Sequence, residues 1–252
     1  SGFVPAAGTA AQARHGIEDT PDLFAADIQK KAKGLAERAL VDLATREIAP
    51  ALDWLEAEHG VAWEVLDGFL YPGHGRHRMH AVPERSGAAL LERLLAAAAR
   101  AEIPIATGAR VTALFRAADG RIAGVEVDRA DGAVERIGCG ALVLACNGYG
   151  ANRELVRRHI PVMGEAPYWG HPGNTGDAVL WGEALGADLR CLSAAQGHGS
   201  LAHPHGALIT WALMMEGGIQ VNAAGERFSD EHQGYSEHTV AVLGQPGGVA
   251  WC

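Results

Sequence analysis

The stretch at residues 141–152, ALVLACNGYGAN, decides the fold that this sequence predicts. Its first five residues, ALVLA, form a continuous apolar run, which is typical of a strand covered on both faces of a parallel sheet. The run leads into glycines and then into a helix that we expect to begin near Asn152. Where a buried strand ends in glycines at a helix start, free backbone N–H groups can meet an anionic cofactor. The stretch therefore predicts an α/β fold with a parallel sheet.

The segments on either side of this stretch agree with that fold. Residues 111–115, 122–127 and 134–137 are predicted to form three strands of a β-meander, because Asp-Gly pairs at 119–120 and 131–132 favour tight turns between them. A further short strand is expected at residues 103–107. After the central stretch, HPGNTGD at residues 171–177 predicts a second glycine turn, which leads into a helix that stops near Gly186.

The N-terminal part of the chain is predicted to be mostly helical. Thr20 is a candidate N-cap and Pro21 a first helical residue, so a helix is expected to start there. Helical periodicity continues over residues 36–57, and an alanine- and leucine-rich helix is predicted at residues 87–100. Between these two helices, residues 68–83 are predicted to form a loop rich in His and Arg.

Composition narrows the function classes. The chain has 252 residues, which suits one large domain or one domain with part of another, and its net charge of −9 argues against nucleic acid or an anionic membrane as the main partner. No apolar run is as long as a bilayer span, so we expect a soluble protein. The four scattered cysteines predict reduced, mostly buried thiols and a cytoplasmic location. The sequence starts abruptly at Ser1 and ends abruptly at Cys252, so we expect it to be a piece of a longer sequence.

The histidines suggest a metal-binding site as an alternative. His74, His77 and His80 are spaced by three residues, and a second group occurs near residue 200. Neither group has a cysteine or carboxylate at a recognised ligand interval, so no metal site is predicted.

Ionisable side chains are concentrated in the stretch at residues 217–238, GGIQVNAAGERFSDEHQGYSEH. Alternation at residues 219–222 predicts a half-buried strand, and residues 223–225 predict a turn. The ionisable residues that follow are Arg227, Asp230, Glu231, His232, Tyr235, Glu237 and His238. They are predicted to be held in place behind the strand, and the alternative is a solvated charged loop.

Five segments together resemble the fumarate reductase and 3-ketosteroid dehydrogenase group of FAD-dependent oxidoreductases. They are GFVPAAGT (2–9, with Gln12, Ile17, Asp19 and Pro21), LVLACNGYGAN (142–152), GNTGDA (173–178), QGHG (196–199) and VNAAGERFSDE (221–231). The resemblance implies a glutathione-reductase-type FAD-binding domain, with a parallel sheet and a β-meander, over residues 1–192. It implies that residues 193–252 begin an α+β capping domain that carries the substrate site.

The resemblance also implies which residues contact FAD. They are Ser1, Gly2, Ala6, Ala7, Val111, Ala145, Asn147, Gly148, Asn174, Thr175, Gly176 and Asp177. The family's N-terminal GxGxxG unit and its closing C-terminal glycine segment have no counterpart in these residues. We therefore expect the isolated chain to bind FAD weakly and to be inactive.

Catalytic roles follow from the same resemblance. Where fumarate reductases have a proton-donating arginine this chain has Tyr235, and the relay positions fall on Trp211 and Met214, which transfer protons poorly. In 3-ketosteroid dehydrogenases a tyrosine of this region removes a proton beside a carbonyl, so Tyr235 is the predicted catalytic residue and His198 is predicted to polarise the substrate oxygen. The structural alternatives are a tyrosine bonded to backbone and a hydrogen-bonded core histidine.

The predicted substrate-binding residues are Thr210, Gln196, Arg227 and Glu231, of which Arg227 and Glu231 are expected to pair with each other and hold the loop. The main hypothesis is a ketosteroid-dehydrogenase-like flavoprotein that adds or removes hydrogen across a C–C bond beside a carbonyl or carboxylate of a small molecule. The alternatives are a di- or tricarboxylate dehydrogenase or fumarate-reductase-like enzyme, and a flavin-free binding module.

Overall fold

The computed structural model describes residues 2–252, which divide into two compact units. The first comprises the described residues up to Pro104, together with His198–His238 and Ala250–Cys252. The second comprises Ile105–Gly197 and Thr239–Val249. The predicted boundary at residue 192 between a cofactor domain and a capping domain remains a prediction.

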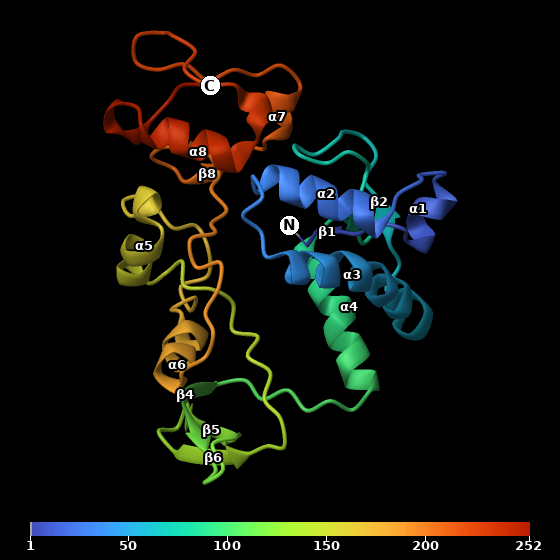
Figure 1. The fold of residues 1–252 in the computed structure, drawn as a ribbon, viewed down its shortest axis with the longest axis vertical. Coiled ribbons are helices and arrows are strands. Elements are labelled where there is room, and N and C mark those ends of the chain that lie inside the picture. Colours follow the sequence, from blue (N-terminus) through green and yellow to red (C-terminus); the bar gives the residue numbers. More distant parts are fainter. Residues whose placement is uncertain (1) are drawn as a thin grey trace. The chain divides into compact units, whose positions relative to one another are not determined.

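The first unit contains the three helices that the sequence predicts, which are α2 (Pro21–Lys31), α3 (Arg38–His59) and α4 (Gly87–Arg100), labelled in Figure 1. It also contains the short helix α1 (Ala10–Arg14), which the sequence does not predict. The Thr20 side chain accepts a hydrogen bond from the Leu23 N–H and so caps α2, whose first residue is Pro21. Gly60 ends α3 with a φ of 68°, a left-handed conformation that costs glycine little.

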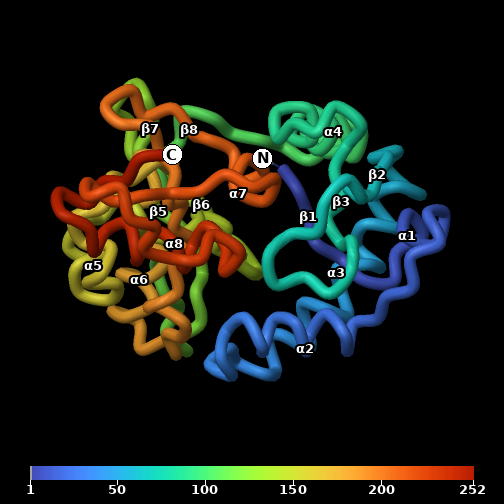
Figure 2. The backbone as a smooth tube through the Cα atoms, turned by 90° about the horizontal axis from the view of Figure 1, so that it is seen from above, coloured from blue at the N-terminus to red at the C-terminus, as the bar shows by residue number. Residues whose placement is uncertain are grey.

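A small antiparallel sheet accompanies these helices (Figure 2). It consists of β1 (Val4–Pro5), β2 (Glu64–Val65) and β3 (Met79–Ala81), with β3 in the centre. A core that includes Leu52 and Trp63 packs beside it. The prediction of a loop throughout residues 68–83 is therefore wrong at β3, because pairing with β1 and β2 overrides its polar composition.

Two polar side chains, His80 in β3 and Arg78 directly before it, are buried because each has hydrogen-bond partners. Arg78 donates two hydrogen bonds to Asp19, from Nε at 2.6 Å and from Nη2 at 3.0 Å, and also bonds to Asp27. Burial alone would raise the pKa of Asp27, but the bonds from Arg78 and from the Gly75 N–H outweigh it and lower that pKa. Paired in this way, a fully buried guanidinium can be tolerated.

The C-terminal part of the first unit is built from short elements. They are β7 (Leu201–Ala202), β8 (Ala207–Leu208), α7 (Ala212–Met215), η2 (Glu231–Gln233) and α8 (Tyr235–Leu243), the last of which continues into the second unit. The strand predicted at residues 219–222 is reduced to two bridges, from Val221 to Arg227 and to Trp251. The predicted turn is present, since the Gly225 N–H bonds to the Asn222 carbonyl.

The second unit contains the predicted meander. Its strands β4 (Ala109–Arg116), β5 (Ile122–Arg129) and β6 (Val134–Gly138) pair in sequence order, all antiparallel. The helical elements of this unit are α5 (Arg153–His159), η1 (Pro161–Met163), α6 (Asp177–Leu185) and η3 (Pro246–Gly248). Tyr149, Leu155 and Val156 form its small core.

The parallel sheet expected from the sequence is not found in residues 2–252. Every strand pair described is antiparallel, and neither residues 103–107 nor 141–145 form strands. Val143 is 86% exposed rather than buried. A parallel strand needs a neighbour to accept and donate its backbone hydrogen bonds, and none is present in the described residues. The fold is therefore mixed α and β, as predicted, but without the predicted parallel sheet.

The cysteines and the helices bear on two further expectations. All four cysteines are free, but Cys146, Cys191 and Cys252 are exposed, so the prediction of mostly buried thiols is wrong. Cys146 is exposed because it follows the unpaired segment at residues 141–145. Within residues 2–252, no helix combines the length and the apolarity needed to cross a bilayer.

Candidate functional site

Two predicted catalytic residues lie together in the first unit. The rings of His198 and Tyr235 are stacked, with centroids 5.3 Å apart and planes at 16°. Trp211 meets both edge-on, at 6.0 Å from His198 and 6.3 Å from Tyr235. His198, Tyr235 and Trp211 form a cluster of rings. Tyr235 begins α8 and Trp211 directly precedes α7, so two helix N-termini position the cluster. The structure thus brings a phenol and an imidazole into contact.

The protonation of His198 follows from its neighbour Ser200. The Ser200 hydroxyl lies 2.8 Å from the Ile209 carbonyl oxygen, which can only accept, so the hydroxyl donates its proton there. Ser200 Oγ then accepts from His198 Nδ1 at 3.1 Å. Burial lowers the pKa of His198, which favours the neutral ring. In that neutral ring the proton is on Nδ1 and the lone pair is on Nε2.

Arg227 and Glu231 form an ion pair beside this cluster. Arg227 Nε donates to Glu231 Oε2 at 2.9 Å, while Oε1 of the same carboxylate accepts from the Gln220 N–H at 2.8 Å. Burial alone would raise the pKa of Glu231, but these hydrogen bonds outweigh it and lower that pKa. The Glu231 side chain is buried and that of Arg227 is half exposed. The pair anchors the loop before α8, and its predicted contact with substrate remains a prediction.

His238 is a member of the cluster to which the sequence analysis assigns no role. Its ring lies 5.4 Å from those of Trp211 and Phe228, and the residue is 1% exposed. Neither of its ring nitrogens has a hydrogen-bond partner among the described residues. Burial lowers the pKa of His238, and the Glu231 carboxylate opposes that effect. The available signal was its spacing of three residues from Tyr235, which places both on one face of α8.

The other predicted substrate residues are less enclosed. Thr210 is exposed, and its Oγ1 accepts a long hydrogen bond of 3.4 Å from the Ala212 N–H. Gln196 is also exposed and belongs to the second unit. Trp211 and Met214, at the positions expected to relay protons in fumarate reductases, are buried. The Trp211 ring is part of the cluster.

The predicted FAD contacts of the first unit lie beneath its surface. Ala6 and Ala7 are buried, and the Ala6 N–H bonds to the Arg78 carbonyl. A Cβ at Gly2 would lie 2.5 Å from Gly87 Cα, so the glycine permits a close approach of two chain segments. Ser1 lies outside the described residues. In this unit the small residues therefore serve backbone packing, and Ala6 and Ala7 present no exposed surface to a cofactor.

The predicted FAD contacts of the second unit include an exposed backbone segment. Ala145, Asn147 and Gly148 are exposed, and Asn147 has a left-handed φ of 66°. No hydrogen bond described in residues 2–252 involves the backbone amides of residues 142–148. Small side chains and unpaired N–H donors are what a nucleotide or pyrophosphate requires. This segment therefore fits a part of FAD.

The remaining contacts predicted in the second unit form a structured turn before α6. The Asn174 carbonyl accepts from the Ala151 N–H, and the Thr175 hydroxyl donates to Asp177 at 3.1 Å. Gly176 caps the helix with a φ of 85°. Val111 is half-buried on β4. Ala151, which follows the exposed segment in sequence, bonds to Asn174 of the turn, so the segment and the turn could contact the same part of FAD.

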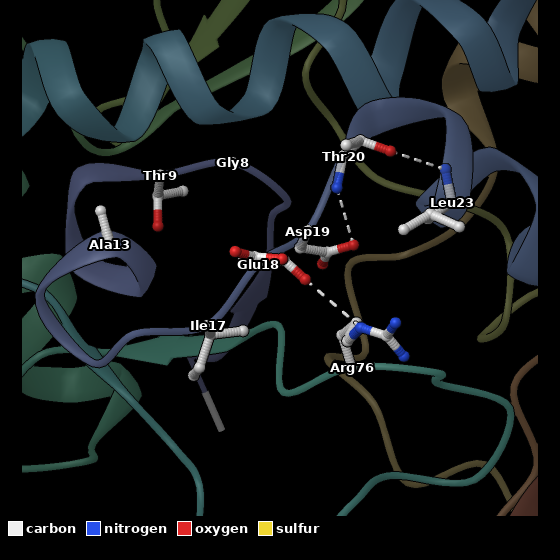
Figure 3. Close-up of a pocket in the computed structure, with 9 residues that line it drawn as sticks. All are labelled: Gly8, Thr9, Ala13, Ile17, Glu18, Asp19, Thr20, Leu23 and Arg76. Carbon is white, nitrogen blue, oxygen red and sulfur yellow. Dashed lines mark hydrogen bonds between the residues drawn. The ribbon is translucent and has the colours of Figure 1, made fainter.

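A surface pocket of the first unit involves none of the predicted site residues (Figure 3). Glu18 and Arg76 line it, and Arg76 Nε donates to the Glu18 carbonyl across it. Asp19 and Thr20 form another wall, where the Asp19 carboxylate accepts from the Thr20 N–H. The Arg76 Nε–H and the Asp19 carboxylate in its walls therefore already have protein partners. In residues 2–252, no group of three or more His, Cys, Asp or Glu side chains is placed to hold a metal.

Comparisons with known proteins define the class of this chain. The family model described as "FAD binding domain" matches residues 1–248. The chain belongs to this family of FAD-binding domains, in which the resemblance noted from the sequence had placed it.

Individual relatives refine this assignment. A probable fumarate reductase, Ifc3, of Shewanella frigidimarina is 29% identical over 100% of this chain and 42% of its own length. Urocanate reductase of Eggerthella lenta is 25% identical over 95% of this chain and 40% of its own length. The chain thus spans less than half of these curated relatives.

Solved structures give the same grouping. The open conformation of a flavocytochrome c3 fumarate reductase matches with a TM-score of 0.84 and 28% identity, over 100% of this chain and 44% of that one. The 3-ketosteroid-Δ4-(5α)-dehydrogenase of Rhodococcus jostii RHA1 matches with a TM-score of 0.75 and 20% identity, over 96% of this chain and 54% of that one. At that lower identity the second match shows the shared fold alone.

Proposed function

We propose that this chain is part of an FAD-dependent oxidoreductase that reduces a C=C bond conjugated to a carboxylate. The observation that carries the proposal is the pairing of His198 with Tyr235, in a chain similar over nearly its whole length to proteins named for fumarate and urocanate reduction. Both named compounds contain a C=C bond beside a carboxylate. This ranks the enoate reductase, first considered as an alternative, above the ketosteroid reaction.

Two residues of the cluster, Tyr235 and His198, have tasks in such a reaction. FAD, when bound, would supply the hydride. The Tyr235 phenol would donate a proton to the other alkene carbon, and His198 would bind a carboxylate oxygen. Arg227 is already paired with Glu231, so it is a poor candidate for the carboxylate. This leaves His198, which is neutral until it gains a proton, as the group of the cluster that can meet the substrate carboxylate.

A second candidate remains the ketosteroid-type dehydrogenation, in which a tyrosine removes a proton beside a carbonyl. Tyr235 supports it, because a phenol stands where the fumarate reductases are expected to have an arginine. The two reactions differ in direction and in the charge of the substrate. A substrate comparison therefore separates them.

The test uses the full-length, FAD-loaded protein and its visible absorption spectrum. With the flavin reduced anaerobically, fumarate and urocanate are expected to reoxidise it, and 4-androstene-3,17-dione is expected to leave it reduced. Tyr235→Phe should slow reoxidation by about 10²-fold or more with the FAD still bound, because it removes the proton donor. Trp54→Phe, an exposed aromatic on α3, is the control and should react at the normal rate.

Other outcomes decide against the proposal. Bleaching of oxidised flavin by a ketosteroid, without reaction of the enoates, would establish the second candidate. A colourless full-length protein that takes up no added FAD would exclude both reactions and leave the flavin-free binding module.

A further inference from the structure

We propose that Ser200 is a positioning residue that keeps the proton of neutral His198 on Nδ1, so that a substrate carboxylate binds together with one proton at Nε2. This inference rests on the proposed function for its ligand, a carboxylate. It adds Ser200 to the site and makes substrate binding depend on proton uptake.

The geometry around Ser200 allows one arrangement of protons. Its hydroxyl has a single proton, and the Ile209 carbonyl at 2.8 Å can only accept, so that proton is committed. His198 Nδ1, 3.1 Å from Oγ, must then be the donor. A serine without the carbonyl contact could turn its proton toward the ring, but this one is held.

The hairpin formed by β7 and β8 keeps this arrangement rigid. Ser200 directly precedes β7 and Ile209 directly follows β8, and the Ile209 N–H donates to the Ser200 carbonyl at 3.0 Å. Ser200 is 3% exposed, so water competes little for its oxygen. The serine is therefore bonded through both backbone and side chain to the same residue.

The consequence for binding follows from the second ring nitrogen. With the proton on Nδ1, Nε2 of the neutral ring has a lone pair, which repels a carboxylate oxygen. Protonation at Nε2 converts the ring to a cation that donates from both nitrogens, and the Ser200 bond is kept in that state. An anion therefore binds well only if His198 gains a proton, whereas a neutral ketone gains less from it.

Few groups around His198 would stabilise a protonated ring before the carboxylate binds. Tyr235 stacks on the ring, and Trp211, which bears no charge, covers its edge. Burial is what lowers the pKa of His198. Arg227, Asp230 and Glu231 act instead on His238, whose ring lies 5.4 Å from that of Trp211. The ligand itself must therefore stabilise the charged ring.

The first experiment reads the proton directly in the full-length FAD protein. ¹⁵N-histidine spectra at pH 7.5 without ligand are expected to show His198 with the proton on Nδ1, assigned by the signal lost in His198→Gln. Ser200→Ala should mix the two neutral tautomers, and Ser200→Thr, which keeps a hydroxyl, should restore the wild-type signal. A wild-type His198 protonated on Nε2, or an unchanged tautomer in Ser200→Ala, would overturn the role of Ser200.

The second experiment measures proton uptake with fumarate as the probe. Calorimetric titration of the oxidised protein at pH 7.5, in phosphate and in Tris, should give about one proton taken up per fumarate in the wild type. Ser200→Ala should take up fewer protons per fumarate, since a neutral ring with Nε2–H can donate to the carboxylate, and its fumarate Kd should change less steeply with pH. Ser200→Thr should match the wild type in proton uptake and in the pH dependence of Kd.

The outcomes keep this inference distinct from the proposed function. Fumarate that binds without proton uptake overturns the proton linkage even if the flavin reaction occurs. Fumarate that does not bind, with the Nδ1 tautomer present, overturns both the carboxylate ligand and the enoate reductase while leaving the Ser200 bond established. Uptake with no flavin reoxidation supports the linkage and contradicts the proposed reaction alone.

Discussion

Strand β3 and residues 141–145 show opposite outcomes of strand formation. Residues 79–81, MHA, contain a central histidine and lie in a segment that composition assigns to a loop, yet they form the middle strand of a buried sheet. Residues 141–145, ALVLA, have the composition of a buried strand, yet they are largely exposed and unpaired. The difference is the presence of partners, since β3 has a neighbour on each side and the apolar run has none among the described residues. Pairing therefore outweighs local composition in both places.

The buried guanidinium beside β3 should give the largest effect. Arg78→Ala leaves the buried Asp19 carboxylate without its cation, and we expect a loss of about 3–5 kcal/mol in the free energy of unfolding. Urea unfolding measures it. Arg76→Ala, two residues away on an exposed side chain, is the matched control and should change stability by less than about 0.5 kcal/mol. Equal losses in the two variants would contradict the described network.

A smaller loss is expected from the hydroxyl that serves β3. Thr9 Oγ1 bonds to His80 Nε2 at 2.8 Å and also accepts from the Gln12 N–H to cap α1. Thr9→Val keeps the shape and removes both bonds, so unfolding should become easier by about 2 kcal/mol. Thr9→Ser should retain most of the stability. If Val and Ser behave alike in urea unfolding, the hydroxyl contributes nothing to holding the strand.

Acid should weaken the first unit gradually. Burial lowers the pKa of His74, His80, His198 and His238, so the folded chain takes up these protons at lower pH than the unfolded chain. The contribution of these groups to the free energy of unfolding is fully present above the unfolded pKa of about 6.5. It falls as the pH falls below that value, because the unfolded state then binds more protons than the folded state.

Urea unfolding between pH 7.5 and 5 would record this fall, over a range above the titration of ordinary carboxylates. His238→Leu removes one of the four groups and should make the slope shallower. A free energy of unfolding that stays level or rises toward pH 5 would contradict the burial of these rings.

The smallest effect is expected in residues 141–145. Val143→Asp would disrupt a buried strand by several kcal/mol, but at 86% exposure it should change stability by less than about 0.5 kcal/mol. The matching change directly after the paired strand β3, Val82→Asp, should be strongly destabilising, since Val82 is fully buried. A large loss from Val143→Asp in urea unfolding would show that another segment covers this run.

The sequence by itself determined the parts of this protein that local chemistry controls. Thr20 and Pro21 predicted the start of α2, and the two Asp-Gly turns predicted the meander. These are local signals, since a cap or a tight turn depends on residues within a few positions. The family followed from five segments in order, and the match over residues 1–248 confirms it.

Only the tertiary structure decided which distant groups meet. That His80 and Arg78 are buried depends on Thr9 and Asp19, some 71 and 59 positions away in sequence. The Ser200–Ile209 contact that orients His198 depends on a hairpin, and the isolation of residues 141–145 depends on absent neighbours among the described residues. Hydrogen bonding and burial are set by what lies across space, and composition along the chain does not contain that information.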